Sequence, residues 1–315
     1  MLGLLPFAAV SVSGGDSDDD DETSPDETGP DTEETNDPTL QGLFLGVEET
    51  DLTAADPADL ADTAEPDVPI SEDDGLQPET PGEDTTSTGS DTITGTTGND
   101  TLTGTANSET IFAGPGDDIV EAGEGSDGVD GGTGSDTLNG GIGNDTILGS
   151  EGADNIVGGD GSDFLLGGDG DDSIDGGADD DSILGGAGSD TINGGLGDDV
   201  LDGGSQSGDD GTGDVLDGQT GDDTLYLGEG DFGTGGSGAD SFHVDGIAQI
   251  TDFDTAQDML VVEYTGGVAP TVTSQSVSSS GLVVSFSNGT VVLLAGLNAP
   301  VDASLISFLD VTPAT

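Results

Sequence analysis

A nine-residue repeat occupies the chain from Ser87 to Val244. Read from Gly131 it runs GGTGSDTLN, and the next nine residues, from Gly140, read GGIGNDTIL. An acidic residue returns at every ninth position from Asp91 to Asp199, and an aliphatic residue follows two places after each acid. The unit is therefore GGxGxDx(aliphatic)x, and a fixed period of this kind predicts a repeat architecture.

Each place in the unit has a physical reason. Glycines at the first, second and fourth places permit positive φ and a tight bend that turns carbonyl groups inward. The residues after the acid suit a short strand with one side chain in a core. A loop and a short strand make half a coil, so two units predict one turn of a parallel β-solenoid. The acids then alternate between two edges, with Asp91, Glu109, Asp127, Asp145, Asp163, Asp181 and Asp199 on one edge and Asp100, Asp118, Asp136, Asp154, Asp172 and Asp190 on the other.

Stacking these acids creates a charge problem. Neighbouring strands lie about 4.8 Å apart, so each edge becomes a ladder of carboxylates that repel one another. The chain contains no Lys or Arg to neutralise them. Calcium, which takes six or more oxygen ligands in flexible geometry, suits such a ladder better than Mg²⁺. The predicted metal ligands are Asp91, Asp100, Asp118, Asp127, Asp136, Asp145, Asp154, Asp163, Asp172, Asp181, Asp190, Asp199, Asp214, Asp223 and Asp240.

The expected core is too small to hold the coil by itself. Two aliphatic side chains per turn contribute roughly 2 kcal/mol each, whereas ordering the residues of one turn costs on the order of 25 kcal/mol before hydrogen bonds are counted. We therefore expect metal binding to supply the folding free energy, as in other sites that do not exist in the unfolded chain.

The nonapeptide resembles that of the repeats-in-toxin (RTX) family of secreted bacterial toxins, proteases, lipases and adhesins. The resemblance implies a right-handed parallel β-roll in which the sixth-place acids and loop carbonyl groups hold Ca²⁺. It also implies export by the type I secretion machinery and folding outside the cell. Two units depart from the pattern. The unit beginning at Gly104 lacks two glycines and carries Glu109, which argues against an ion there, and Asp179 replaces a fourth-place glycine.

Composition excludes several classes of function. A net charge of −68 excludes nucleic acid and anionic membrane surfaces as partners, because those need a cationic face. The absence of Cys excludes disulfides and zinc–thiolate sites. His243 is the sole histidine, which excludes His-pair zinc motifs, and the many equivalent acids nominate no catalytic pair. We therefore expect no enzymatic activity.

The flanks of the repeat predict three regions. Residues 1–86 are rich in Asp, Glu, Thr and Pro and predict a disordered acidic segment. The apolar stretch Met1–Val12 in it is too short to span a bilayer. Residues 87–244 form the roll. Residues 245–315 predict a small β-rich cap, with a hairpin turn at Ser287-Asn288-Gly289. Val301 to Val311 resembles the C-terminal export signals of the RTX family.

Register changes near the end of the repeat. The step from Asp199 to Asp214 predicts a six-residue bulge around residues 205–210, after which the period resumes at Asp223. The unit that follows is one residue short of the period, and its expected acid position falls on Phe232. Irregular units of this kind are typical of the ends of solenoids.

These observations predict a secreted, extracellular, non-enzymatic protein that folds on binding several Ca²⁺ ions, about ten at millimolar calcium. One alternative is an adhesion or matrix protein in which calcium stiffens the roll and another region binds a cell-surface partner. A second alternative is an ion or mineral buffer that stays mostly disordered.

Overall fold

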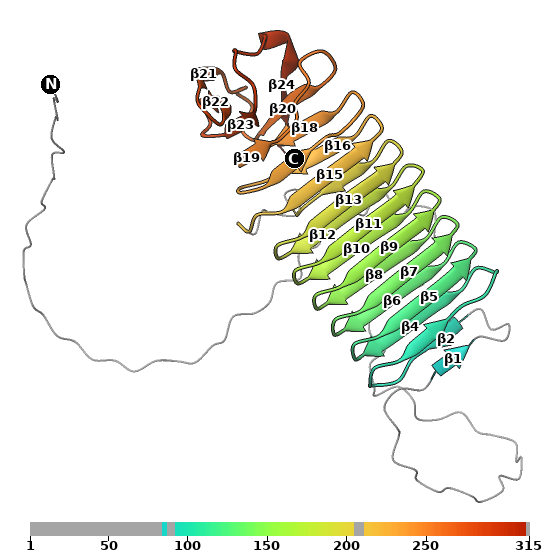
Figure 1. Ribbon diagram of the computed structural model, residues 1–315. Helices are drawn as coiled ribbons and strands as arrows, with labels where there is room; N and C mark the ends of the chain where they lie inside the picture. Colours follow the sequence, from blue (N-terminus) through green and yellow to red (C-terminus); the bar gives the residue numbers. More distant parts are fainter. Residues whose placement is uncertain (1–83, 87–91, 205–210, 313–315) are drawn as a thin grey trace, which may run out of the picture. The chain divides into compact units, whose positions relative to one another are not determined.

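The repeat folds into a parallel β-solenoid of about nine turns. The computed structural model describes residues 84–86, 92–204 and 211–312. Successive strands alternate between two sheets, so that each strand pairs in parallel with the strand one full turn away (Figure 1). In the middle of the roll Leu138 lies opposite Ile156, and Ile174 follows on the next strand. The partners are 18 residues apart, which confirms that two units make one turn.

The described residues form two sheets. The first sheet contains, in spatial order, β1 (Asp84–Thr86), β3 (Thr101–Thr103), β5 (Ile119–Glu124), β7 (Thr137–Ile142), β9 (Asn155–Asp160), β11 (Ser173–Ala178), β13 (Thr191–Leu196), β15 (Val215–Thr220), β17 (Phe232–Thr234), β19 (Ile247–Ile250), β23 (Val291–Ala295), β22 (Gly281–Phe286) and β21 (Val272–Val277). The second contains β2 (Thr92–Thr94), β4 (Thr110–Pro115), β6 (Gly128–Thr133), β8 (Thr146–Glu151), β10 (Phe164–Asp169), β12 (Ser182–Ala187), β14 (Val200–Asp202), β16 (Thr224–Leu227), β18 (Ser241–Val244), β20 (Met259–Tyr264) and β24 (Ile306–Asp310).

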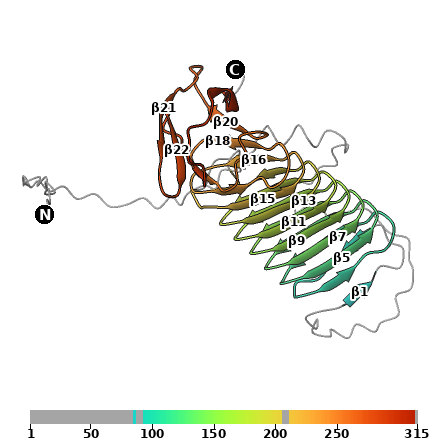
Figure 2. The ribbon, with the colours of Figure 1, turned by 45° about the horizontal axis from the view of Figure 1, so that its top comes forward.

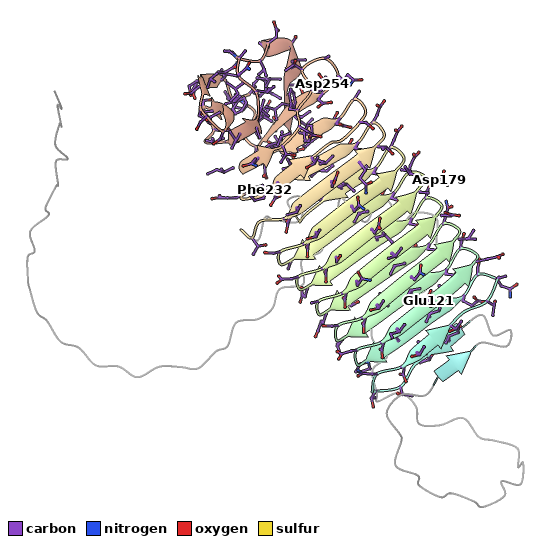
Figure 3. The ribbon with its side chains drawn as sticks, viewed as in Figure 1. Glu121, Asp179, Phe232 and Asp254 are labelled. Atoms are coloured by element: carbon purple, nitrogen blue, oxygen red, sulfur yellow. The ribbon has the colours of Figure 1, made fainter. Side chains whose placement is uncertain are left out.

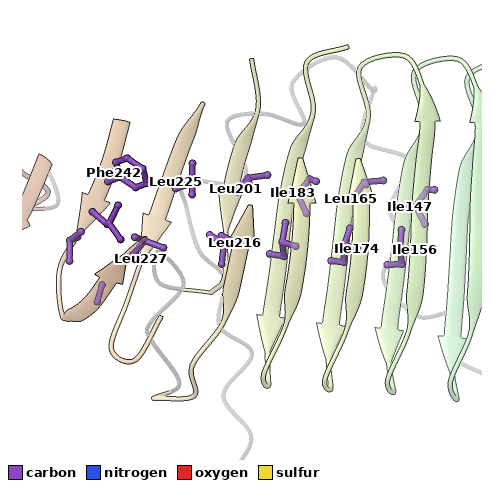
Figure 4. Packing of buried hydrophobic residues seen from close by; sticks show 14 of the residues in the cluster. Ile147, Ile156, Leu165, Ile174, Ile183, Leu201, Leu216, Leu225, Leu227 and Phe242 are labelled. Atoms are coloured by element: carbon purple, nitrogen blue, oxygen red, sulfur yellow. The ribbon is translucent and has the colours of Figure 1, made fainter. Parts of the chain in front are cut away.

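The core is a column of aliphatic side chains between the two sheets. Ile147 and Leu165 come from one sheet and Ile156 and Ile174 from the other, and none is more than 2% exposed (Figure 4). One aliphatic residue per unit supplies this column, as the repeat predicts. Phe242 continues it and packs against Phe253 with a ring-centroid distance of 5.9 Å.

The strands are longer than the sequence indicates. A typical strand such as β7 covers six residues and runs through the first two glycines of the following unit. Its buried residues are Leu138 and Gly140, so the first glycine belongs to the inner face of the sheet rather than to the loop. The loop between strands is correspondingly short, and the sixth-place acid ends it.

The C-terminal residues extend both sheets of the roll. β23 pairs in parallel with β19, and β22 and β23 form the antiparallel hairpin that the Ser-Asn-Gly turn predicts. β24 pairs with β20 in the other sheet, after the 3₁₀ turn η2 (Ala303–Leu305). Figure 2 shows β21 and β22 beside the end of the stack that contains β16 and β18. The residues between Val301 and Val311 therefore contribute a strand, whereas a role in export stays a prediction.

The N-terminal boundary lies slightly earlier than Ser87. β1 pairs with β3 in the first sheet, with Asp84 opposite Thr101. The expected disordered segment up to residue 83, with Met1–Val12, lies outside the described residues, as does the bulge at residues 205–210. In the part of the chain that the structure describes, no helix has the length and hydropathy needed to cross a bilayer.

Candidate metal-binding ladders

The sixth-place acids are buried along both edges of the roll. From Asp100 to Asp240 each of these side chains is at most 5% exposed. The register of the strands stacks them directly above one another, because each follows a loop at the same place in the coil. Burial of so many carboxylates without a single Lys or Arg in the chain is costly unless another partner compensates the charge.

One oxygen of each carboxylate serves the fold. The backbone N–H of Asp127 donates to Oδ1 of Asp145 at 2.8 Å, and the N–H of Asp145 donates to Oδ1 of Asp163 at 2.7 Å. The same bond recurs from Asp100 to Asp258, between acids on consecutive coils. The ladder also crosses the insertion, because Asp199 donates to Asp223 at 2.8 Å. The stacking of the acids is therefore continuous from Asp199 to Asp223.

The other carboxylate oxygen is buried without a hydrogen bond. These Oδ2 atoms belong to interior members of both ladders: Asp118, Asp127, Asp136, Asp145, Asp154, Asp163, Asp172, Asp181, Asp199 and Asp223. A carboxylate oxygen withdrawn from water in this way strongly favours a cation. The orphaned oxygens are the most direct sign of a ligand in the described residues.

In most units the first place is a glycine, which leaves room beside that oxygen. A Cβ placed on Gly158 would lie 2.3 Å from Oδ2 of Asp163 and 2.6 Å from the carbonyl oxygen of Gly176. A Cβ on Gly167 would meet Asp172 and Gly185 in the same way. At Gly158 and Gly167 a side chain is therefore excluded, because a carboxylate and a backbone carbonyl of the next coil approach closely. Two N-terminal units instead have alanine at this place, Ala113 and Ala122, both fully buried. The second and fourth glycines, such as Gly141 and Gly143, have the positive φ that the sequence predicts.

The donor set consists of hard oxygens from side chain and backbone. Among the described residues no three His, Cys, Asp or Glu side chains gather as a metal-binding group. A metal site here must therefore combine ladder carboxylates with backbone carbonyl groups. Carboxylate and carbonyl oxygens in a flexible loop are ligands that Ca²⁺ accepts, so the residues fit this ion.

Burial changes the acidity of the ladder. Burial raises the pKa of Asp163, Asp181 and Asp223 to about 7. The backbone N–H that donates to each carboxylate lowers its pKa, and the negative charges of neighbouring acids raise it. The pKa values of Asp136 and Asp172 rise to about 6 for the same reasons. Without a cation, these groups therefore hold a proton to a higher pH than an exposed Asp does.

At the first described acid of each ladder, the protein itself supplies partners for the second carboxylate oxygen. Oδ2 of Asp100 accepts the backbone N–H of Thr96 at 2.5 Å and the Thr96 hydroxyl at 3.0 Å. Glu109 reaches back to Thr105 in the same way, with its carboxylate 2.5 Å from the hydroxyl and 2.9 Å from the N–H. Glu109 nonetheless belongs to the ladder, since its own N–H donates to Asp127 at 2.7 Å.

The C-terminal end contains two further ladder acids that are not among the predicted ligands, Asp231, which is off the period, and Asp258, which lies 18 residues after Asp240. Asp231 accepts the N–H of Asp214 at 3.0 Å and that of Gly228 at 2.6 Å. Asp258 accepts the N–H of Asp240 at 3.1 Å and that of Asp254 at 2.6 Å. The sequence Asp258-Met259-Leu260 keeps the acid and the aliphatic residue of the unit, although the glycines before it are missing. This part of the pattern could have identified Asp258 as a ladder acid.

Phe232 was the wrong position for an acid. It lies opposite Val215, where the residue after each acid belongs, and its side chain is 44% exposed (Figure 3). The coil is one residue shorter than the others, so Asp231 occupies the acid position instead. Of the predicted ligands, Asp91 lies outside the described residues, and the others named from Asp100 to Asp240 all lie in the two ladders.

The fold and these ladders define a parallel β-roll with acid-lined edges. Residues 85–242, half of the chain, match the RTX calcium-binding nonapeptide repeat in seven overlapping segments. The chain therefore belongs to the RTX (hemolysin-type) calcium-binding repeat family. Members of this family are typically secreted.

Two solved structures are similar to this chain. One is the AlgE6R3 subunit of the mannuronan C5-epimerase from Azotobacter vinelandii, with 26% identity over 46% of this chain and 78% of that one, and a TM-score of 0.26. The other is the extracellular lipase LipA from Serratia marcescens, with 17% identity over 71% of this chain and a TM-score of 0.26. This chain spans 41% of the lipase. No curated protein sequence matches.

Proposed function

We propose that this protein is a secreted, non-enzymatic calcium-binding module whose roll becomes ordered when Ca²⁺ binds outside the cell. The observation that carries the proposal is the row of buried Oδ2 atoms without hydrogen bonds along both edges. Seven of these oxygens lie near a backbone carbonyl of the next coil, those of Asp136, Asp145, Asp154, Asp163, Asp172, Asp181 and Asp223. No cationic Lys or Arg exists in the chain to pair with them. A divalent cation with oxygen preference satisfies both groups at once.

The proposed ligands are the ladder carboxylates together with loop carbonyl groups. Bound calcium would neutralise the ladder and hold consecutive coils together. In this proposal the interior acids from Asp118 to Asp223 carry the ions, with Asp214 and Asp240 in the same ladders. Asp100 stands apart, because Thr96 already occupies its second oxygen. About ten ions remains the expected number at millimolar calcium.

Location and lack of activity are parts of the proposal with separate support. Members of the family are typically secreted, and millimolar calcium is the range in which weak extracellular modules are loaded. Type I export of an unfolded, calcium-free chain fits a fold that needs the ion. The ladder acids have similar environments, whereas acid–base catalysis needs paired groups with different pKa values. The proposal therefore assigns no reaction to the ladders.

A calcium titration of the full chain tests this function. We expect the circular dichroism spectrum to change from coil to β and the hydrodynamic radius to fall as Ca²⁺ rises through the millimolar range. Mg²⁺ at the same concentration should have much less effect. A chain that remains equally compact and protease-resistant after complete removal of calcium with EDTA would overturn the proposal. A spectrum that stays coil-like in about 10 mM calcium would favour the ion-buffer alternative.

A further inference from the structure

A second row of side chains runs along each edge of the roll, one residue before each ladder acid. These fifth-place side chains are exposed, and many accept the N–H of the fifth-place residue one coil later. On the edge that contains Asp127 the row begins with neutral residues: the N–H of Ser126 bonds to Ser108, that of Asn144 to Ser126, and that of Ser162 to Asn144, at 3.0 to 3.3 Å. The row therefore ties neighbouring loops together without charge in this part.

The same row becomes acidic in its C-terminal part. The N–H of Asp198 donates to Oδ1 of Asp180, that of Asp222 to Oδ1 of Asp198, and that of Ala239 to Oδ1 of Asp222, each at 2.8 Å. These acids occupy three consecutive coils. Asp179 adds a fourth carboxylate from a loop at this edge (Figure 3), where it takes a φ of 76° in place of the usual glycine.

The ladder acids beside this acidic row each have one carboxylate oxygen without a hydrogen bond. Asp181, Asp199 and Asp223 are each 1% exposed, and their Oδ2 atoms accept no hydrogen bond. The two rows are adjacent, because Asp180, Asp198 and Asp222 directly precede the ladder acids Asp181, Asp199 and Asp223. The loops between Asp179 and Asp223 thus place exposed charge next to oxygens that need a cation.

We infer that Asp180, Asp198 and Asp222 make the adjoining part of this edge the tightest calcium-binding segment of the roll. They act through the electric field at the buried sites and not as ligands. A negative charge near a site strengthens the attraction of the site for a cation, and the neutral row around Ser126 and Asn144 lacks this contribution. The inference rests on the proposed calcium function and ranks the sites within it.

The chain itself provides an isosteric test. Asn144 shows that an amide oxygen accepts the same inter-coil hydrogen bond as an aspartate at this place. The variant D180N/D198N/D222N therefore keeps the bonds and removes three charges. Calcium affinity is measured on the full chain by titration against a competing chelator. We expect the tightest class of ions to bind about threefold to tenfold more weakly, and we expect the difference to disappear in about 1 M salt, where exposed charges are screened.

A matched control removes three charges elsewhere. E121Q/D175N/D217N changes acids on the outer face of the first sheet, where Glu121 lies (Figure 3), and should leave the tightest class of ions unchanged. The reverse variant S126D/N144D/S162D extends the acidic row and should enlarge that class. Unchanged affinity in D180N/D198N/D222N, or an equal loss in the control, would overturn the inference alone. A wild-type chain that binds no calcium would instead overturn the proposed function.

Discussion

Asp127 and Asp145 show how a single carboxylate serves two purposes. Oδ1 of Asp145 accepts the backbone N–H of Asp127 at 2.8 Å, whereas Oδ2 of Asp145 is buried with no hydrogen bond. The first oxygen fixes the spacing of consecutive coils and the second is left for a cation. The repeat therefore needs a branched, doubly accepting side chain at this place. Ser or Thr would supply a single oxygen.

Replacement of Asp145 by Asn separates these two purposes. The amide oxygen can still accept the N–H of Asp127, but the group beside it becomes a donor that cannot bind a cation. We expect D145N to lose at least one bound Ca²⁺ and to need a higher calcium concentration for folding. Ion stoichiometry by equilibrium dialysis, together with the midpoint of the circular dichroism titration, measures both effects.

Asp100 provides the matched replacement at the end of the ladder. Because Thr96 already donates to its second oxygen, we expect D100N to bind as many calcium ions as the wild type. E109Q should behave in the same way, since Thr105 closes that site. Loss of an ion in D100N equal to the loss in D145N would show that the protein-made cap opens to bind metal.

Gly158, in the middle of the roll, should tolerate no side chain, although Ala113 and Ala122 stand at the same place in two N-terminal units. In G158A the new methyl group would lie 2.3 Å from Oδ2 of Asp163 and 2.6 Å from a carbonyl of the next coil. We expect G158A to weaken calcium binding at that loop and to destabilise the loaded roll by about 1–3 kcal/mol, as overpacking does. Chemical denaturation in saturating calcium measures this loss.

Gly128 is the control for this substitution. A Cβ on Gly128 meets nothing within 4 Å, and its φ is not positive. G128A should therefore match or slightly exceed the stability of the wild type, because alanine restricts the unfolded chain. Equal destabilisation of G128A and G158A would contradict the close approach of the two oxygens at the first glycine.

The period of the sequence determined most of the architecture in advance. Acids nine residues apart, each followed by an aliphatic residue, were enough to predict two edges, two sheets and an 18-residue turn, which Leu138 opposite Ile156 confirms. The ends were harder to predict. Asp231 loses the spacing and Asp258 loses the glycines, and the pairing of their strands with earlier coils fixes their place.

The sequence could not show that one oxygen of each carboxylate accepts a backbone N–H while the other is left for a cation. A repeated Asp indicates a ladder, but which oxygen accepts a backbone N–H depends on the exact stacking of coils. The local closure of Asp100 by Thr96 depends likewise on a loop conformation. Threonine at the second place of the first units, where later units have glycine or another residue, is the sequence feature associated with this closure.

The central column of the core gives a further prediction. Ile156 is fully buried, and its strand pairs with those of Leu138 and Ile174. I156A should destabilise the calcium-loaded roll by about 2–5 kcal/mol, because the cavity in a tightly stacked core cannot collapse easily. V157A, at the next residue on the outer face, should cost much less. Chemical denaturation in saturating calcium measures the free energy of unfolding of both variants. Equal losses of stability in I156A and V157A would contradict the alternation of inward-facing and outward-facing side chains along the strand.

The ladder acids should make calcium binding and folding depend on pH in opposite directions. Burial raises the pKa of Asp163, Asp181 and Asp223 to about 7 in the calcium-free fold, whereas an unfolded Asp titrates near about 3.9. Without calcium, these groups favour the fold fully below about pH 4, and this contribution is lost as the pH rises through about 7. Calcium requires the ionised groups, so its affinity should instead rise with pH over the same window.

Two circular dichroism series between pH 4 and pH 8 test this dependence. In EDTA we expect the β signal to be largest at the acid end and to fall toward pH 8. In a fixed, subsaturating calcium concentration, the number of bound ions should increase from pH 5.5 to pH 8. About 1 M salt screens the general repulsion among exposed acids, so a pH dependence that persists there belongs to the buried ladder. Calcium affinity independent of pH across this range would show that the ladder acids are not the ligands.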